Sequence, residues 1–120
     1  MSTPPISYRK GAAWMAIVAI GVLSLLPKEH IVRTGLGGHI EHVVAYTLTA
    51  FIVTSAYGIA NRLTIAVGLI AYAGVLELLQ NFSPGRTPAV EDFLCSATGV
   101  VLGIALYAFA DRFVPLVRRT

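Results

Sequence analysis

The chain has 120 residues, of which 56% are hydrophobic and only 12% are charged, and its formal net charge is +3. Soluble domains carry roughly 25% charged residues, and a chain this short cannot bury so much apolar surface in water, so an ordinary soluble domain is excluded. A nucleic-acid partner is not expected either, because the basic residues stand in ones and twos between apolar runs.

Four apolar segments predict an all-α integral membrane protein, a four-transmembrane-helix bundle in one domain over residues 1–120: 11–27, 39–60, 63–82 and 88–113. A helix needs about 20 apolar residues to cross the hydrocarbon core, with a range of about 17–25. The first segment follows the basic pair Arg9-Lys10, as in a secretory signal peptide. Because no small-residue cleavage site precedes Pro27, we expect an uncleaved helix, with the signal peptide as the alternative.

The basic residues predict the topology of these four spans. One side would carry Arg9, Lys10, Arg62, Arg112, Arg118 and Arg119, and the other Lys28, Arg33 and Arg86. Cytoplasmic loops are enriched in Lys and Arg, so we expect both termini to be cytoplasmic. Three aromatic residues would then fall near the inner membrane boundary, where amphipathic rings are favoured: Trp14, Tyr57 and Tyr107.

The polar residues within the spans gather toward the predicted outer face. His39 and His42 share a helix face, Glu77 and Gln80 share another, and Asp92 begins a stripe with Ser96. Ionisable groups at membrane depth usually face the bundle interior and pair with one another. We therefore expect an outward-open polar pocket lined by the last three helices. Its candidate ligand-binding residues are His42, Tyr46, Glu77, Gln80, Arg86, Asp92 and Ser96.

Each of these residues also has a simpler interpretation. The histidines could form half of a metal site with Glu77 or Asp92, but there is no His-Glu-x-x-His signature, so neither a metal nor a cofactor is expected. Glu77 is either a general base or the salt-bridge partner of Arg86, and the Arg86 guanidinium is either a phosphate ligand or a loop anchor.

A Gly-x-x-x-Gly sequence at Gly99 and Gly103 allows close approach of two helices. Packing within the bundle is the favoured interpretation of this pair, and homo-oligomer formation is the alternative. Cys95 cannot form an intrachain disulfide because it is the chain's one cysteine, and it is interpreted as a small core residue.

At these positions the sequence resembles the VanZ-like membrane proteins. Three motifs carry the resemblance: Ser24-Leu25-Leu26-Pro27, then His42 with Tyr46, then Glu77-x-x-Gln80-x-Phe82-x-Pro84-Gly85-Arg86 continued by Asp92, Gly99 and Gly103. The chain departs from the family pattern where Gly38-His39, Ala89 and Ser96 replace the common Asp-Lys, Ser and Asn. The resemblance implies a multi-helix protein of the bacterial cytoplasmic (inner) membrane, in a family whose founding member is linked to teicoplanin resistance.

Three functions remain open from the sequence. The leading hypothesis is a cell-envelope protein that binds membrane lipids, or a lipid-linked envelope precursor, in the outward polar pocket. The second is a membrane enzyme that acts on such a headgroup, with Glu77 or His42 as general base. The third is a structural or partner-binding subunit without a ligand.

Overall fold

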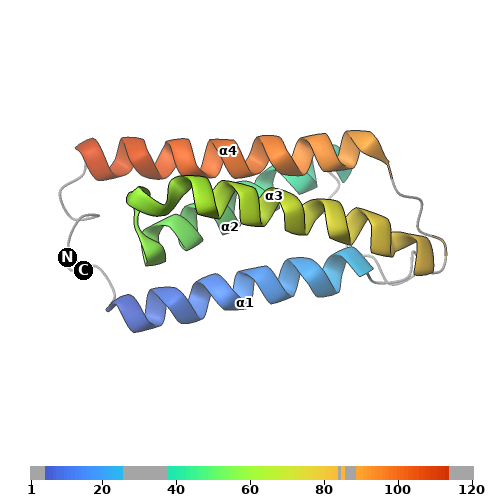
Figure 1. Ribbon diagram of the computed structural model, residues 1–120, viewed down its shortest axis with the longest axis horizontal. Coiled ribbons are helices and arrows are strands. Elements are labelled where there is room, and N and C mark those ends of the chain that lie inside the picture. The colour runs from blue at the N-terminus through green and yellow to red at the C-terminus, as the bar shows by residue number, and fades with distance from the viewer. Residues whose placement is uncertain (1–4, 26–37, 84, 86–88, 114–120) are drawn as a thin grey trace.

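The computed structural model describes residues 5–25, 38–83, 85 and 89–113. Four long helices run through these residues: α1 (Ile6–Leu25), α2 (Gly38–Tyr57), α3 (Arg62–Leu79) and α4 (Val90–Phe113). Single 3-10 turns, η2 (Ile59–Asn61) and η3 (Gln80–Phe82), precede and follow α3. No β-strand occurs in this part of the chain, so the predicted all-α class is confirmed (Figure 1).

The helix ends differ from the predicted ones for local reasons. Helix α1 begins at Ile6 rather than at residue 11, and its first turns include the buried Arg9. Helix α2 ends at Tyr57 because Gly58 has φ 93, a backbone conformation that is costly for any residue with a side chain. The end predicted for the first span, and Thr87 and Pro88 before α4, lie outside the described residues.

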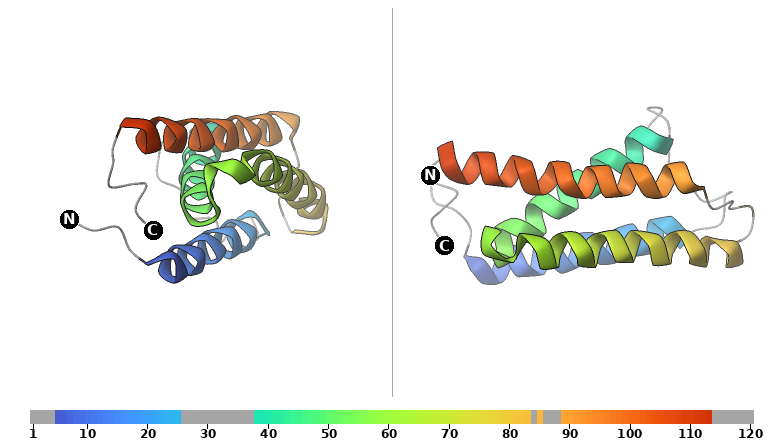
Figure 2. Two further views of the ribbon diagram at one scale, coloured as in Figure 1. Left: turned by 60° about the vertical axis from the view of Figure 1, so that its left-hand side comes forward. Right: turned by 45° about the horizontal axis from the view of Figure 1, so that its top comes forward.

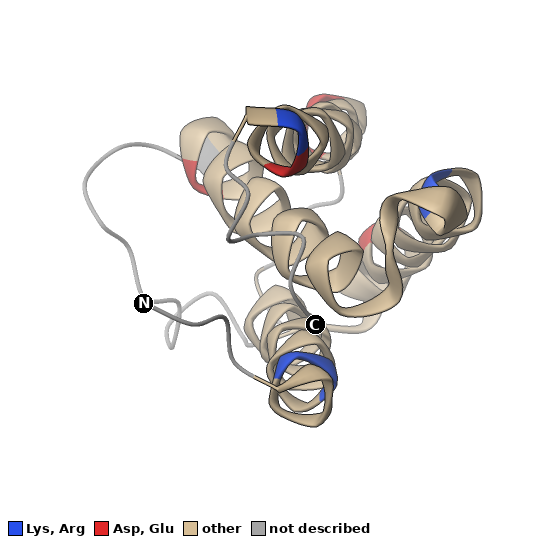
Figure 3. Ribbon diagram, turned by 90° about the vertical axis from the view of Figure 1, so that its left-hand side faces the viewer, with Lys and Arg blue, Asp and Glu red and all other residues tan. Residues whose placement is uncertain are grey.

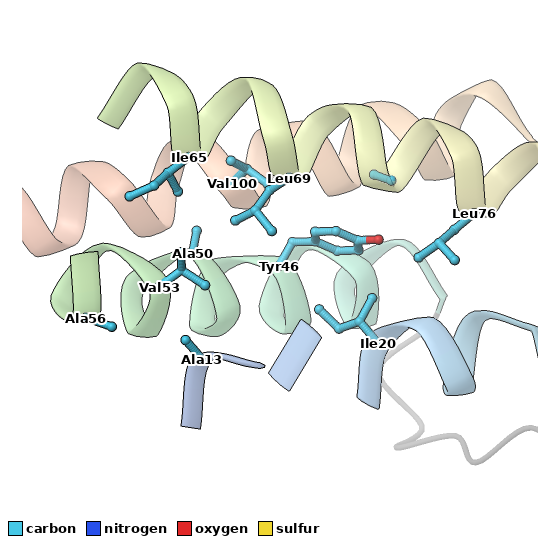
Figure 4. Packing of buried hydrophobic residues seen from close by; sticks show 11 residues of the cluster. Ala13, Ile20, Tyr46, Ala50, Val53, Ala56, Ile65, Leu69, Leu76 and Val100 are labelled. Carbon is cyan, nitrogen blue, oxygen red and sulfur yellow. The ribbon is translucent and has the colours of Figure 1, made fainter. Parts of the chain in front are cut away.

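Helix α2 occupies the centre of the structure and contacts the other three helices. It crosses α4 obliquely, with α1 on the side away from α4 and α3 beside both α2 and α4 (Figure 2). Buried side chains from all four helices meet along α2, among them Tyr46, Ala50, Val53 and Ala56 from α2 itself (Figure 4). The core is therefore organised around α2.

Two glycines of α4 allow this crossing. A Cβ atom at Gly99 would lie 2.6 Å from the Val43 carbonyl oxygen, and one at Gly103 would lie 2.7 Å from the Ala50 Cβ. Small residues let helix backbones approach closely, which is how helices associate in the absence of a hydrophobic driving force. In this structure the Gly99–Gly103 stripe lies against α2 of the same chain.

The outer surface of the bundle is apolar. Met15 is 75% exposed, Leu63 75% and Phe82 85%, as expected for side chains that contact lipid rather than water. Among the residues that the structure describes, three segments are long and apolar enough to cross a membrane: Ile6–Leu25, Ile59–Phe82 and Val90–Phe113. Helix α2 is not among them, since His39, Glu41 and His42 lower the hydropathy of its first turns. The structure thus supports a membrane protein with three such segments, and the fourth span stays a prediction.

Positively and negatively charged residues lie toward opposite ends of the long axis of the bundle. All Lys and Arg residues that the structure describes lie at the end shared by the start of α1, the start of α3 and the end of α4 (Figure 3): Arg9, Lys10, Arg62 and Arg112. We call this the basic end. The opposite end, here called the acidic end, holds every described Asp and Glu except Asp111: Glu41, Glu77, Glu91 and Asp92.

Candidate functional site at the acidic end

Three side chains from three helices converge at the acidic end. His42 of α2, Glu77 of α3 and Asp92 of α4 place one potential ligand atom each within 4.8 Å of one another. Glu77 is buried, with 9% of its surface exposed, and His42 and Asp92 are half-buried. The structure therefore brings together three of the seven predicted binding residues, and this group is called the three-residue cluster below.

The position of Glu77 follows from the start of α4. Ala89 is the residue before this helix, and its carbonyl accepts the N–H groups of Asp92 and Phe93 at 3.1 and 3.3 Å. Its own N–H donates to Glu77 Oε2 at 3.0 Å. The first N–H groups of a helix lack partners within the helix, and negative charge there is favoured by the helix dipole. Glu77 thus links the end of α3 to the start of α4.

Asp92 faces both histidines of α2. Its Oδ1 atom lies 3.4 Å from Nε2 of His39, whose side chain is 63% exposed. Asp92 also belongs to the three-residue cluster with His42. His39 therefore covers the solvent side of the aspartate, while His42 lies on the side shared with Glu77.

Tyr46 and Ser96 lie one turn deeper, as their spacing predicts. The Tyr46 hydroxyl is hydrogen-bonded to the Ser96 side chain, and Ser96 Oγ donates to the Asp92 carbonyl at 3.0 Å. Both residues are buried, with 3% and 2% of their surfaces exposed. These bonds satisfy polar groups that would be costly in a hydrocarbon environment, and they hold α2 against α4 beneath the cluster.

Gln80 makes a contact with α1, and its place among the ligand-binding residues stays a prediction. Its Nε2 donates to the Ser24 carbonyl at 3.0 Å, and Ser83 Oγ donates to the Leu25 carbonyl at 2.8 Å. These carbonyls belong to the last turn of α1, and the final carbonyls of a helix are commonly bonded by groups from outside it. Gln80 and Ser83 therefore cap α1 from the end of α3, and Ser83 carried no signal in the sequence.

A groove lies beside the three-residue cluster, between α3 and α4. Its volume is about 290 Å³, and its lining is mostly apolar: Gly74, Glu77, Leu78, Ala89, Val90 and Phe93. The sequence predicted a polar pocket lined by three helices. The groove involves α3 and the start of α4 and is a separate feature, so the predicted pocket stays a prediction. Glu77 belongs to both the groove and the cluster.

The basic end contains a polar contact that sequence reasoning missed. Arg9 is only 8% exposed, and its Nη1 donates to the Ser55 carbonyl of α2 at 2.9 Å. Nearby, Trp14 Nε1 donates to the Tyr57 hydroxyl at 2.8 Å, and Lys10 lies over the Tyr57 ring. Arg9 was interpreted only as a topology signal, since a basic pair before an apolar segment does not show that either of its side chains is buried.

Two residues discussed from the sequence remain, Arg86 and Cys95. Arg86, the expected phosphate ligand, lies outside the described residues. Cys95 is half-buried in α4.

Comparison with known proteins identifies the family of the chain. No curated protein and no solved structure matches it. The VanZ/LLP1 family model matches residues 6–111, which include all four helices up to Asp111 and the whole three-residue cluster. The chain therefore belongs to the VanZ/LLP1 family of proteins.

Proposed function

We propose that this protein resides in the bacterial cytoplasmic membrane and binds a lipid, or a lipid-linked envelope precursor, at its acidic end. The observation that carries the proposal is the double position of Glu77, which lines the apolar groove and belongs to the three-residue cluster. An amphipathic ligand needs an apolar surface and a polar site next to each other. Pockets that bind such ligands combine mostly apolar walls with a few convergent polar groups.

The chemistry of each part indicates what it would hold. The groove offers Leu78, Val90 and Phe93 to the first carbons of an acyl or prenyl chain. His42 and Asp92 would take the hydroxyl or amine groups of the headgroup, since carboxylates accept hydrogen bonds and an imidazole donates or accepts them. We expect Arg86 to bind the headgroup phosphate through its guanidinium, as its place in the family motif suggests.

Native mass spectrometry of gently extracted protein tests the proposal. The wild type should retain one phospholipid or polyprenyl-linked species selectively, while Arg86→Ala and Asp92→Asn should lose it. Glu91→Gln is the matched control, since Glu91 is the exposed neighbour of Asp92 in the same helical turn. Equal lipid retention by all variants, without selectivity, would overturn the proposal.

Two glycine variants on α3 test whether the lipid binds in the groove. A side chain at Gly74 would extend toward the Phe93 ring, whose nearest atom lies 3.4 Å from the position that a Cβ would take, whereas a Cβ at Gly68 would have nothing within 4 Å. We expect Gly74→Ile to displace the retained lipid and Gly68→Ile to leave it in place. Retention of the lipid by Gly74→Ile, at the level of Gly68→Ile, would mean that the lipid binds elsewhere on the bundle surface.

A structural subunit without a ligand is the second candidate function. It is favoured by the hydrogen bonds of Glu77, Gln80 and Ser83, all of which serve helix ends. Under this alternative, Gly103→Leu should impair the cellular role more than Asp92→Asn does. Teicoplanin susceptibility of cells that carry each variant, compared with cells that lack the protein, is the cellular readout that distinguishes the two functions.

A further inference from the structure

The three-residue cluster has the donor set of a metal site. It combines one imidazole and two carboxylates, contributed by α2, α3 and α4, with the ligand atoms within 4.8 Å of one another. Around a tetrahedral cation with bonds of about 2.0–2.2 Å, ligand atoms are about 3.3–3.5 Å apart. The ligand atoms are up to 4.8 Å apart, and small side-chain rotations would bring them to the shorter spacing without a change in the helix packing.

Charge at this site also favours a cation. Glu77 is nine-tenths buried and lies beside Asp92, and two carboxylates brought together away from water repel each other. The Ala89 amide engages Oε2 of Glu77, whereas an ionised carboxylate has about four acceptor positions.

The groove supplies an independent indication of a ligand here. Glu77 lines it together with Leu78 and Phe93, so an open groove of about 290 Å³ borders this buried residue. The neighbouring contacts have the character of a supporting shell around a metal: the Ala89 amide orients Glu77, and His39 lies 3.4 Å from Asp92. Such outer contacts orient ligands and are a usual part of metal sites.

We propose that His42, Glu77 and Asp92 bind a divalent transition-metal cation of the Zn²⁺ or Mn²⁺ class. The imidazole ligand favours these ions over Ca²⁺ and Mg²⁺, which prefer oxygen ligands alone. Three protein ligands leave a coordination position open, as in zinc sites that also bind a substrate or water. With the cation bound, a phosphate oxygen of the headgroup would take this position in place of direct contacts from His42 and Asp92, and this clause alone rests on the proposed function.

Zinc binding by the full-length chain, purified in detergent without a polyhistidine tag and stripped by a chelator, tests the site. Equilibrium dialysis with elemental analysis should find about one tightly bound Zn²⁺ per chain. Glu77→Gln and Asp92→Asn should each weaken binding by about 100-fold or more, since even the loss of an outer contact costs 10–100-fold. The side-chain oxygen of Gln can still accept the Ala89 amide, so Glu77→Gln should keep its fold, which circular dichroism verifies.

The matched controls are Glu91→Gln and Asp111→Asn, which remove acids outside the cluster and should bind Zn²⁺ like the wild type. Cobalt gives a second readout: Co²⁺ in the wild type should show visible absorption bands that His42→Ala alters. The proposed site would be overturned if the wild type showed no saturable Zn²⁺ binding. It would also be overturned if Glu77→Gln and Asp92→Asn bound Zn²⁺ as tightly as the wild type.

Failure of the metal site and failure of lipid binding are distinguishable. Selective lipid retention by protein that does not bind Zn²⁺ would overturn the metal site and leave the proposed function standing. Zinc binding that depends on the three residues, in protein that retains no lipid selectively, would uphold the metal site and overturn the proposed function.

Discussion

The Gln80 side chain donates a hydrogen bond of 3.0 Å to the carbonyl of Ser24, so the end of α3 caps the end of α1. Both residues stand in motifs by which the sequence resembles the family, and the bond connects the two motifs directly. A polar residue in such a motif can therefore be required for packing of the helices even when it does not contact a ligand.

Replacement of Gln80 should destabilise the bundle. Gln80→Leu would remove this donor to the Ser24 carbonyl, and a typical intramolecular hydrogen bond contributes about 0.5–1.5 kcal/mol to stability. Thermal unfolding in detergent should show a lower midpoint. Asn81→Ala is the control, because Asn81 is exposed and bonds only locally to the Leu78 carbonyl, so its midpoint should stay near that of the wild type. Equal midpoints for Gln80→Leu and the wild type would contradict the capping role.

The contact between α2 and α4 should be sensitive to a single methyl group. At Gly103 an added Cβ would meet the Ala50 Cβ at 2.7 Å and the Phe51 nitrogen at 3.0 Å, so the backbones must separate. We expect Gly103→Ala to destabilise the fold by about 1–3 kcal/mol, the usual cost of overpacking. Gly68→Ala, on open α3 surface, should be neutral or stabilise by up to about 1 kcal/mol. Similar unfolding midpoints for these two variants would show that the close approach is dispensable.

Comparison of variants at Arg9 and Lys10 shows whether Arg9 stabilises the fold or serves only as a charge that sets membrane topology. Arg9→Met removes the buried donor to the Ser55 carbonyl and should cost about 1.5–3 kcal/mol, the range for a hydrogen bond to a charged group. Lys10→Met removes the same charge from an exposed site over Tyr57 and should cost much less. Thermal unfolding of the two purified variants measures the difference. If both variants unfold at the same temperature, Arg9 acts only through its charge.

Membrane orientation can be measured at two exposed asparagines. Asn61 lies at the basic end before α3, and Asn81 lies in the 3-10 turn after it. In a Cys95→Ser background, we expect Asn61→Cys to react with a membrane-impermeant thiol reagent only after the cells are opened. Asn81→Cys should react in intact cells, because the basic end is predicted to be cytoplasmic. The reverse pattern would place both termini outside.

The helical segments were predictable because their signal is local. Runs of apolar residues of membrane-spanning length, interrupted by polar turns, indicated four helices, and the structure has helices in all four places. The exact ends depended on details that composition does not carry. Gly58 ends α2 through its backbone conformation, and Ile6 begins α1 because the turn that contains Arg9 is packed against α2.

The candidate site was predictable only in part. Helical spacing placed His42, Glu77 and Asp92 near the same membrane face, but it could not show which side chains would meet. Gln80 shares a helix face with Glu77 and yet bonds to α1, because each residue of a helix in the interior of a bundle can face a different neighbour. The groove between α3 and α4 was also hidden, since it depends on the separation of two helices.

The sequence by itself determined that this protein is helical and suited to an apolar solvent. Twenty-residue apolar runs must satisfy their backbone groups internally, and a helix does so without any partner, so no tertiary contact is needed for that conclusion. Only the tertiary structure decided that His42, Glu77 and Asp92 meet. They stand on three separate helices, and the rotation and depth of each helix follow from the packing of Gly99 and Gly103 against α2 and from the bond between Glu77 and Ala89.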